Sequence, residues 1–245
     1  MTQSLSLPLL LDGRPVHVVG GGSLGGPLAE GLFRAQVPEL HLWDFDIVEG
    51  RNRFNQRVYE CDVGKPKVRV RKRILRAIYS QSATKLVLHE ECVLPGTEFS
   101  GVVLSAVDWN RIRYKEVWPN VKDNVNVSFF GDGRVGMDGG KAYGLNPNNP
   151  YHQLRYEDPV HNHPDPEGGE ENAACKSEHP LPWNADAVAS EVLWRMIRWL
   201  HLEKGCADPY DNFVGWQYMP RKVELTEQWD AGTIRVMHTQ EDTTE

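Results

Sequence analysis

The sequence predicts an α/β fold with an open, mostly parallel sheet, helices on both faces, a long crossover loop and extra C-terminal strands. Three observations lead to this prediction. The 245 residues are enough for one large domain with a full core. Short apolar runs that suit buried strands are followed by amphipathic patterns that suit helices. Between the first such run and the first helix, three glycines stand at the spacing G-x-G-x-x-G, typical of a nucleotide-binding turn.

The first unit comprises an apolar strand at residues 16–19, the three glycines and a helix. Gly20 permits the tight bend, Gly22 lets a phosphate approach the backbone, and Gly25 lets helix and strand pack closely. The helix is indicated by apolar residues at helical spacing, namely Leu28, Leu32 and Phe33. Phosphate would then lie at the positive end of the helix dipole. These residues predict a Rossmann-like nucleotide site.

A second apolar run, at residues 40–43, predicts the next strand and ends in Asp44. An acidic side chain about twenty residues after the glycines can bind a ribose hydroxyl. A dehydrogenase would need little more, but here a second aspartate, an asparagine, a glutamine and a lysine follow at defined spacing. These residues are Asp46, Asn52, Gln56 and Lys67, the last at the start of a helix expected to run to residue 77.

This stretch resembles the ThiF/MoeB/HesA family, whose adenylating fold is shared with ubiquitin-activating enzymes. The family pattern is roughly G-x-G-x-x-G, D-x-D-x-V-x-x-x-N-x-x-R-Q and G-x-x-K. The resemblance implies that Asp44 binds the ribose of ATP and that Lys67 holds the phosphates. It also implies that Asn52 and Gln56 order the site, with Asp46 supporting a metal shell or, alternatively, capping the loop.

One position departs from the pattern. Asn55 stands where the family has the arginine that precedes Gln56. Arg53 and Arg57 are the candidates to supply that positive charge from a shifted register.

A continuous apolar run at residues 101–107 predicts a central strand that is buried on both faces. It ends in Asp108, and a helix is expected at residues 109–117. At a strand end, Asp108 is well placed for Mg²⁺ or the reacting phosphate, although it could also be a helix N-cap. The family carries D-N-x-x-x-R here, so the resemblance implies functional roles for Asp108 and Arg113, with Trp109 replacing the asparagine.

The remaining elements are expected in order along the chain. Residues 1–14 form a lead-in that ends in an Asp12-Gly13 turn, and Arg14 is either a solvent-facing residue or an arginine that reaches a dimer partner's nucleotide. Residues 85–93 form a strand, and residues 125–145 form two strands about a bend in which Asp132 and Arg134 set turn geometry and pair locally. A core helix at 185–202, strands at 213–225 and 233–238 and a frayed tail at 240–245 follow.

Residues 146–183 have no strong period, and in the resembled family this segment is a crossover loop near the catalytic cysteine. Three interpretations of Cys175 remain open. It could be a nucleophile that forms a thioester, a buried structural residue, or a zinc ligand together with the histidines His161, His163 and His179. Cys61, Cys92 and Cys206 are expected to be structural.

Composition excludes several classes of function. The net charge of −7 disfavours binding of nucleic acid by charge neutralisation, and the basic run at 65–76 is interpreted as a solvated helix face. No apolar run is long enough to span a membrane, so a cytoplasmic protein is expected. The four cysteines form no C-x-x-C pair, so neither a disulfide framework nor a four-cysteine zinc site is supported.

The resemblance implies one 245-residue adenylation domain that uses ATP and Mg²⁺ to activate the C-terminal glycine of a ubiquitin-like protein. Thioester formation and transfer to a conjugating enzyme could follow, as in bacterial ubiquitin-like conjugation systems of antiphage operons. The alternatives are a sulfur-carrier adenylyltransferase of cofactor biosynthesis, a catalytically silent nucleotide-binding partner subunit and an NAD-dependent dehydrogenase. A homodimer is expected by family analogy.

Overall fold

The computed structural model describes residues 6–135, 140–157, 182–205, 228–230 and 233–235. Its centre is a six-stranded sheet in the order β3-β2-β1-β4-β5-β6. The strands are β1 (Val16–Val19), β2 (Glu39–Trp43), β3 (Lys85–His89), β4 (Gly101–Ser105), β5 (Val127–Val135) and β6 (Gly140–Leu145). All neighbouring pairs are parallel except β5 and β6. The predicted open, mostly parallel α/β sheet is therefore confirmed.

The chain builds the sheet outward in two directions from its middle. It runs from β1 to β2 and β3 on one side, then crosses back to place β4 and β5 on the other side of β1. The crevice at the carboxyl ends of β1 and β4 is thus a topological switch point, where open α/β sheets bind their ligands. Any nucleotide site is expected at this end of the sheet.

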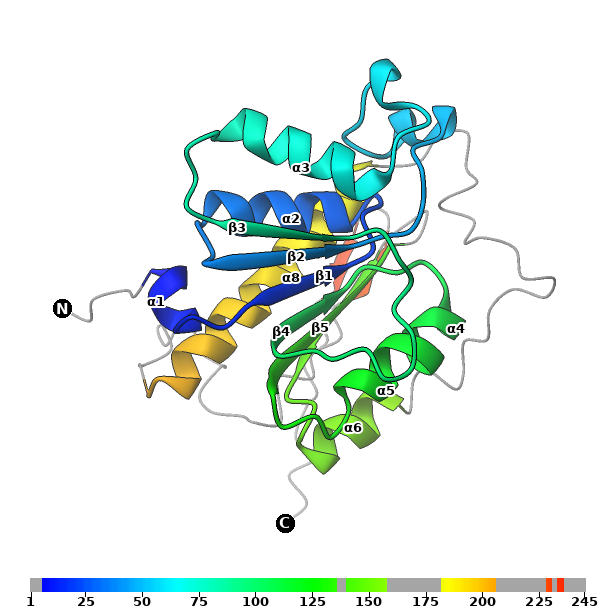
Figure 1. Ribbon diagram of the computed structural model, residues 1–245. Helices are drawn as coiled ribbons and strands as arrows, with labels where there is room; N and C mark the ends of the chain where they lie inside the picture. The colour runs from blue at the N-terminus through cyan, green and yellow to red at the C-terminus, as the bar shows by residue number, and fades with distance from the viewer. Residues whose placement is uncertain (1–5, 136–139, 158–181, 206–227, 231–232, 236–245) are drawn as a thin grey trace, which may run out of the picture.

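Helices cover both faces of the sheet (Figure 1). One face carries α1 (Leu7–Leu11), α2 (Gly25–Arg34), α3 (Lys67–Ile78) and the long α8 (Pro182–Glu203). The other carries α5 (Trp118–Val121) and α6 (Pro150–Glu157), with α4 (Asn110–Ile112) joined to α5 by the π-helical turn Arg113–Val117. This arrangement confirms helices on both faces.

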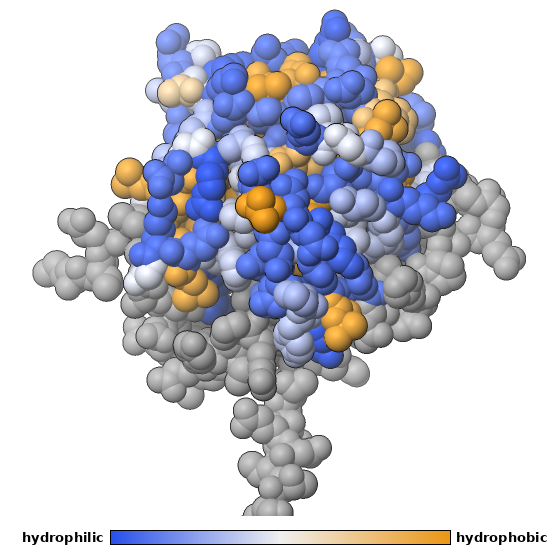
Figure 2. Space-filling model, turned by 60° about the horizontal axis from the view of Figure 1, so that its bottom comes forward, coloured by the Kyte–Doolittle hydropathy of each residue, from blue (hydrophilic) through white to orange (hydrophobic). Residues whose placement is uncertain are grey.

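Two hydrophobic clusters match the two layers. The first packs side chains of α2 and α8, such as Leu28, Leu32 and Met196, against Val18 and Leu104 of the sheet. The second packs helical residues such as Val117, Trp118 and Tyr156 against Val103 and Phe130. Hydrophilic residues predominate on the face in Figure 2, where hydrophobic residues form small separate patches.

Several element predictions need correction. Residues 1–14 contain the helix α1, although the Asp12-Gly13 turn is confirmed by positive φ angles at both residues. The strand expected at 85–93 ends at His89, and the one expected at 101–107 ends at Ser105. The segment expected as a loop from residue 146 includes the helix α6, because Tyr156 and His152 are buried against the sheet.

The C-terminal predictions are met in part. The helix expected at 185–202 is α8, which begins three residues earlier and ends one later. Within the strand expected at 233–238, the structure describes β8 (Thr233–Arg235), which pairs with β7 (Gln228–Asp230), a strand that the sequence did not indicate. The strand expected at 213–225 and the tail lie outside the described residues. Among the described helices, none is long and apolar enough to cross a lipid bilayer.

Candidate functional site

A cavity of about 530 Å³ opens at the carboxyl ends of β1, β2 and β4. It lies at the topological switch point, and its volume is in the range of small-molecule sites. Most of the residues predicted from the sequence line it: Gly20, Gly22, Asp44, Asp46, Asn52, Gln56, Lys67 and Asp108. Asn55, the position that departs from the family pattern, lines it as well. Residues separated by almost ninety positions in the chain are thus brought to one place.

The glycine loop has the close contacts expected of it. Gly20 has a φ of +100°, and a side chain there would lie 2.7 Å from the carbonyl oxygen of Ala106. A Cβ atom on Gly25 would lie 1.7 Å from the carbonyl oxygen of Gly20, so only glycine allows α2 to begin so near β1. Gly25 therefore acts through packing and does not line the cavity, whereas Gly20 and Gly22 do.

Asp44 joins the loop after β2 to the glycine loop. One carboxylate oxygen accepts a hydrogen bond from the backbone N–H of Gly21 at 2.6 Å, and the other accepts one from the N–H of Asp46 at 2.8 Å. Burial raises the pKa of Asp44, although the charge of nearby Lys67 and the hydrogen bonds from the two backbone N–H groups oppose the shift. The carboxylate thus fixes the backbone that a nucleotide would approach.

Lys67, the first residue of α3, forms an ion pair of 2.7 Å with Asp46. Burial lowers the pKa of Lys67, but attraction to Asp44 and Asp46 outweighs it, and the net pKa is raised. The ammonium therefore remains charged at neutral pH. Asp46 contacts Lys67 and does not cap its loop through its side chain.

The segment after Asp46 is stabilised by hydrogen bonds between its own side chains and backbone. The side chain of Asn52 accepts a hydrogen bond from the N–H of Glu49 at 2.8 Å, which closes a capping box on the 3₁₀ turn Gly50–Phe54. Asn52 thus orders this wall of the cavity. The side-chain oxygens of Asn55 and Gln56 are buried and have no hydrogen-bond partner in the part of the chain that the structure describes, so they could accept bonds from a ligand.

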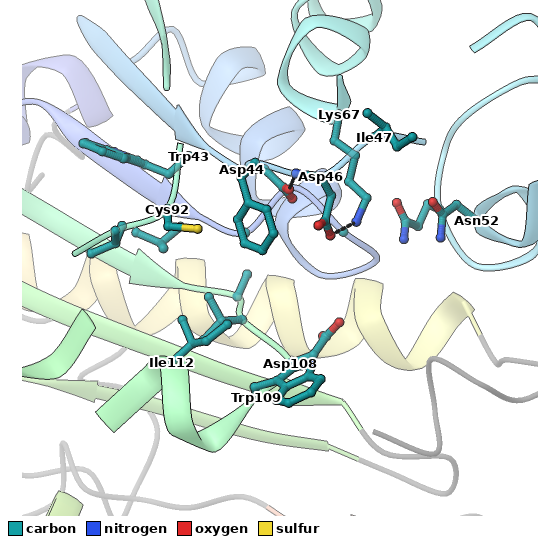
Figure 3. A pocket seen from close by; sticks show the side chains of 18 of the residues that line it. Trp43, Asp44, Asp46, Ile47, Asn52, Lys67, Cys92, Asp108, Trp109 and Ile112 are labelled. Atoms are coloured by element: carbon teal, nitrogen blue, oxygen red, sulfur yellow. Dashed lines mark hydrogen bonds and ion pairs between the residues drawn. The ribbon is translucent and has the colours of Figure 1, made fainter. Parts of the chain in front are cut away.

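Asp108 lies across the cavity from Lys67, with Trp109 beside it (Figure 3). Its carboxylate is exposed. The alternative role as a helix N-cap is wrong, because the N-cap position of α4 is Trp109. The structure describes no group of three or more acidic, histidine or cysteine side chains that could hold a metal alone. Asp108 fits the Mg²⁺ mode in which one or two carboxylates and the substrate phosphates share the ion.

Arg113 lies outside the cavity lining. Its Nε donates to Asp132 at 2.8 Å, and its other nitrogens contact Asn110 and the carbonyl oxygen of Val107. Asp132 is fully buried within β5 and also accepts hydrogen bonds from Arg134 and Tyr156, both at 3.1 Å. The predicted local ion pair of Asp132 and Arg134 is present. The predicted role of Asp132 in turn geometry is wrong, because Asp132 lies in the middle of β5. Arg113 holds the backbone next to Asp108 in place.

The two arginines proposed to replace the one missing at Asn55 do not reach the cavity. Arg57 pairs with Glu30 at 2.5 Å and Asp186 at 2.8 Å, and Arg53 pairs with Glu60. Arg14 is likewise engaged at the opposite end of α8, where it contacts Glu203 at 2.8 Å. These contacts within the chain differ from the solvent-facing role considered for Arg14, whereas its reach to a dimer partner's nucleotide stays a prediction.

Some lining residues were missed by the sequence analysis. Arg111 belongs to α4 and lines the cavity; its position three residues after Asp108, just beyond a predicted strand end, could have indicated it. Cys92, expected to be a structural residue in a strand, follows β3, is exposed and lines the cavity. Cys61 is exposed in a 3₁₀ turn. Cys175, with His161, His163 and His179, lies outside the described residues, as does Cys206.

The cavity has two chemically different ends. Trp43, Cys92 and Ile112 lie at one end, while Asp46, Lys67 and Asn52 lie at the other (Figure 3). Apolar Phe45, Val93 and Val107 add to the lining. An end with the apolar side chains of Trp43 and Ile112 and a second end with the charge of Lys67 suit a ligand that joins a flat base to phosphates. The fold and this cavity define the protein as one with an α/β nucleotide-binding fold.

Comparison with known proteins bears out the predicted resemblance over part of the chain. The ThiF family model matches residues 11–100, which confirms the predicted resemblance over the stretch that holds the glycine loop, Asp44 and Lys67. No curated protein matches the chain.

Solved structures share the fold. Escherichia coli MccB determined with ATP has 16% identity and a TM-score of 0.54, over 78% of this chain and 58% of that one. MccB with AMPCPP and MccA has 16% identity and a TM-score of 0.56, over the same shares of the two chains. E. coli tRNA N6-threonylcarbamoyladenosine dehydratase, TcdA, matches at 22% identity and a TM-score of 0.44, over 54% and 55% of the two chains. The matched region spans little more than half the length of these proteins.

Proposed function

We propose that this chain is a ThiF-type adenylyltransferase that uses ATP and Mg²⁺ to activate the C-terminal carboxylate of a protein or peptide. The observation that carries the proposal is the meeting of Asp44, Lys67 and Asp108 around one cavity at the switch point. A nucleotide-binding dehydrogenase has no evident use for Asp46, Lys67 and Asp108 together. The fold and the match to the ThiF family support adenylation.

The charges of the cavity support a metal-bound polyphosphate as the ligand. Six carboxylates line it, against three cations. The carboxylates are Asp44, Asp46, Glu49, Glu91, Asp108 and Glu116, and the cations are Arg51, Lys67 and Arg111. This excess of negative charge would repel a bare polyphosphate strongly, and a divalent cation on the nucleotide would weaken that repulsion. Bound Mg²⁺ would offset charge that develops on the phosphates.

The proposed reaction is an in-line displacement at the α-phosphorus of ATP. A carboxylate oxygen of the partner forms a bond to that phosphorus, the bond to the bridging oxygen breaks, and pyrophosphate leaves. The protein contributes placement and electrostatic stabilisation more than covalent chemistry. Lys67 and Arg111 would contact the phosphates, Asp44 the ribose, and Asp108 the metal.

The proposed partner is a ubiquitin-like protein that ends in glycine, with Cys175 accepting the acyl group as a thioester before transfer to a conjugating enzyme. A bacterial ubiquitin-like conjugation system is the proposed setting, and a sulfur-carrier protein is the alternative partner. A homodimer and a single domain over residues 1–245 are part of the proposal.

Exchange of labelled pyrophosphate into ATP tests the adenylation step, with a ubiquitin-like protein encoded by a neighbouring gene as the partner. Exchange by the wild type and its loss in Asp108→Asn are expected, while the exposed control Glu98→Gln should retain exchange. A thiol-sensitive adduct lost in Cys175→Ala would support the thioester step. ATP binding without exchange for any candidate partner would favour the silent-subunit alternative, for which the loss of the motif arginine at Asn55 is the main support.

A further inference from the structure

Arg71 is a buried cation directly behind the glycine loop. It belongs to α3, its side chain is 3% exposed, and its Nη2 donates to the carbonyl oxygen of Gly21 at 3.1 Å. The guanidinium also abuts the first turn of α2, since a Cβ atom on Gly26 would lie 2.7 Å from Nη2. Arg71 lies in the basic run at residues 65–76, and its burial shows that the interpretation of this run as a solvated helix face is wrong at this position.

The other arginines of α3 are engaged elsewhere. Arg69 pairs with Glu90, Arg73 pairs with Asp62, and Arg76 donates to the carbonyl oxygens of Ser82 and Thr84. Arg71 differs from Arg69 and Arg73, because no ion pair with a carboxylate is found for it among the residues that the structure describes, and it differs from Arg76 because it is buried. Within the described ranges, the Nε atom of Arg71 is buried and has no hydrogen-bond partner.

An unpaired buried charge is costly, and proteins retain one where it serves a ligand or a specific structure. Burial and the charge of nearby Arg57 lower the pKa of Arg71 to about 10, so the guanidinium is still protonated at neutral pH. Its charge lies where the amides at the start of α2 already favour an anion. The two positive contributions therefore act on the same side of the cavity.

We infer that Arg71 is an electrostatic positioning residue of the nucleotide site, which draws the phosphates of ATP to the glycine loop and orients that loop through Gly21. The inference rests on the proposed function. It assigns to Arg71 the positive charge that the family's arginine would supply at the position of Asn55. Arg71 does not line the cavity, so it acts through the loop and through its field. Bound phosphate offsets the cost of burying the guanidinium.

Binding of ATP-Mg²⁺, AMP and adenosine to the full chain, measured by calorimetry, tests this role. Arg71→Met replaces the charge by an apolar chain of similar length, a change that often preserves folding. We expect its Kd for ATP to rise about tenfold, equal to about 1.4 kcal/mol, while its Kd for adenosine changes much less. Arg71→Lys should retain most of the preference for ATP. Arg69→Met, on the exposed face of the same helix, is the matched control and should bind like the wild type.

Thermal unfolding would reveal whether Arg71→Met fails to fold. In that case a second variant still tests the inference. Gly26→Ala requires the guanidinium to shift from its place against the loop, and it should weaken binding of ATP more than that of adenosine. Arg71→Met protein that binds ATP like the wild type overturns the inference, as does an equal loss of ATP, AMP and adenosine, which would indicate a purely structural role. Wild-type protein that binds no nucleotide overturns the proposed function as well.

Discussion

Lys67 and Asp46 tie the start of α3 to the loop that follows β2 through an ion pair of 2.7 Å. The backbone repeats this connection, because the N–H of Lys67 donates to the carbonyl oxygen of Asp46 at 2.9 Å. Two segments that were recognised separately in the sequence are thereby locked together at the cavity. Lys67 is held at the edge of the site before any ligand binds, which is the preorganisation that electrostatic catalysis requires.

Replacement of Lys67 by alanine should reduce ATP–pyrophosphate exchange by about 10²–10³-fold, because a preplaced charge on the phosphates is lost. Lys72→Ala is the control, since Lys72 is exposed on the same helix. Unchanged exchange in Lys67→Ala would contradict the assignment of Lys67 to the phosphates.

Cys92 provides a chemical probe of the cavity. It lines the site, whereas Cys61 is equally a free, exposed thiol outside the lining. Alkylation of Cys92 by iodoacetamide should be slowed by ATP-Mg²⁺, while that of Cys61 should not change. Burial and the neighbouring carboxylates raise the pKa of Cys92, so the reaction should be followed above neutral pH by peptide mass spectrometry. Equal protection of both thiols would argue against a nucleotide in this cavity.

Asp132 is the hub of the buried network beneath Asp108. Asp132→Asn would leave Arg113 and Arg134 without a compensating charge and should lower the free energy of unfolding by about 3–5 kcal/mol. Urea denaturation measures the change. The control is Glu203→Gln, which removes a partly exposed partner of Arg14 and should cost less than about 1 kcal/mol. A loss below that of the control would mean that the network contributes little to stability.

His17 predicts a pH dependence of stability. Burial, with the nearby charges of His41 and His89, lowers the pKa of His17 to about 3 from an ordinary value of 6.5, while Glu39 opposes the shift. The unfolded chain therefore binds the proton more readily, and stability is full above about pH 6.5 and falls as the pH drops towards 3. Between pH 6.5 and 5, this group should remove up to about 1.4 kcal/mol per pH unit.

His17→Gln should flatten the slope of the free energy of unfolding against pH in that range. The wild type and the variant are compared by urea denaturation at matched ionic strength. Parallel slopes would show that His17 takes up its proton equally in both states.

The sequence predicted the parallel core of the fold because apolar runs and the glycine spacing are local signals. Residues 16–19, 40–43 and 101–105 form strands that helices cover on both faces. Such strands are mostly apolar in sequence, which is why they could be predicted. Predictions failed where the signal was tertiary. The helix α6 has weak apolar periodicity, and its position depends on Tyr156 meeting Asp132 across the sheet layer.

The site residues that could be predicted are those that follow the end of a strand or begin a helix. Asp44, Lys67 and Asp108 satisfy that rule. Arg113 did not reach the cavity, because its guanidinium is drawn to the buried Asp132. Arg71 could not have been found, because its burial depends on the missing side chain of Gly26, which lies forty-five positions earlier.

The contact between Arg71 and Gly26 has an evolutionary consequence. A Cβ atom at position 26 would lie 2.7 Å from Nη2 of Arg71, so a side chain there requires the guanidinium to move from the place that it holds in this structure. Homologues that carry a larger residue at position 26 should therefore carry a small residue at position 71, and these are the ones expected to have the motif arginine at position 55. The three positions would then be inherited as one unit, a pattern that an alignment of relatives can verify or refute.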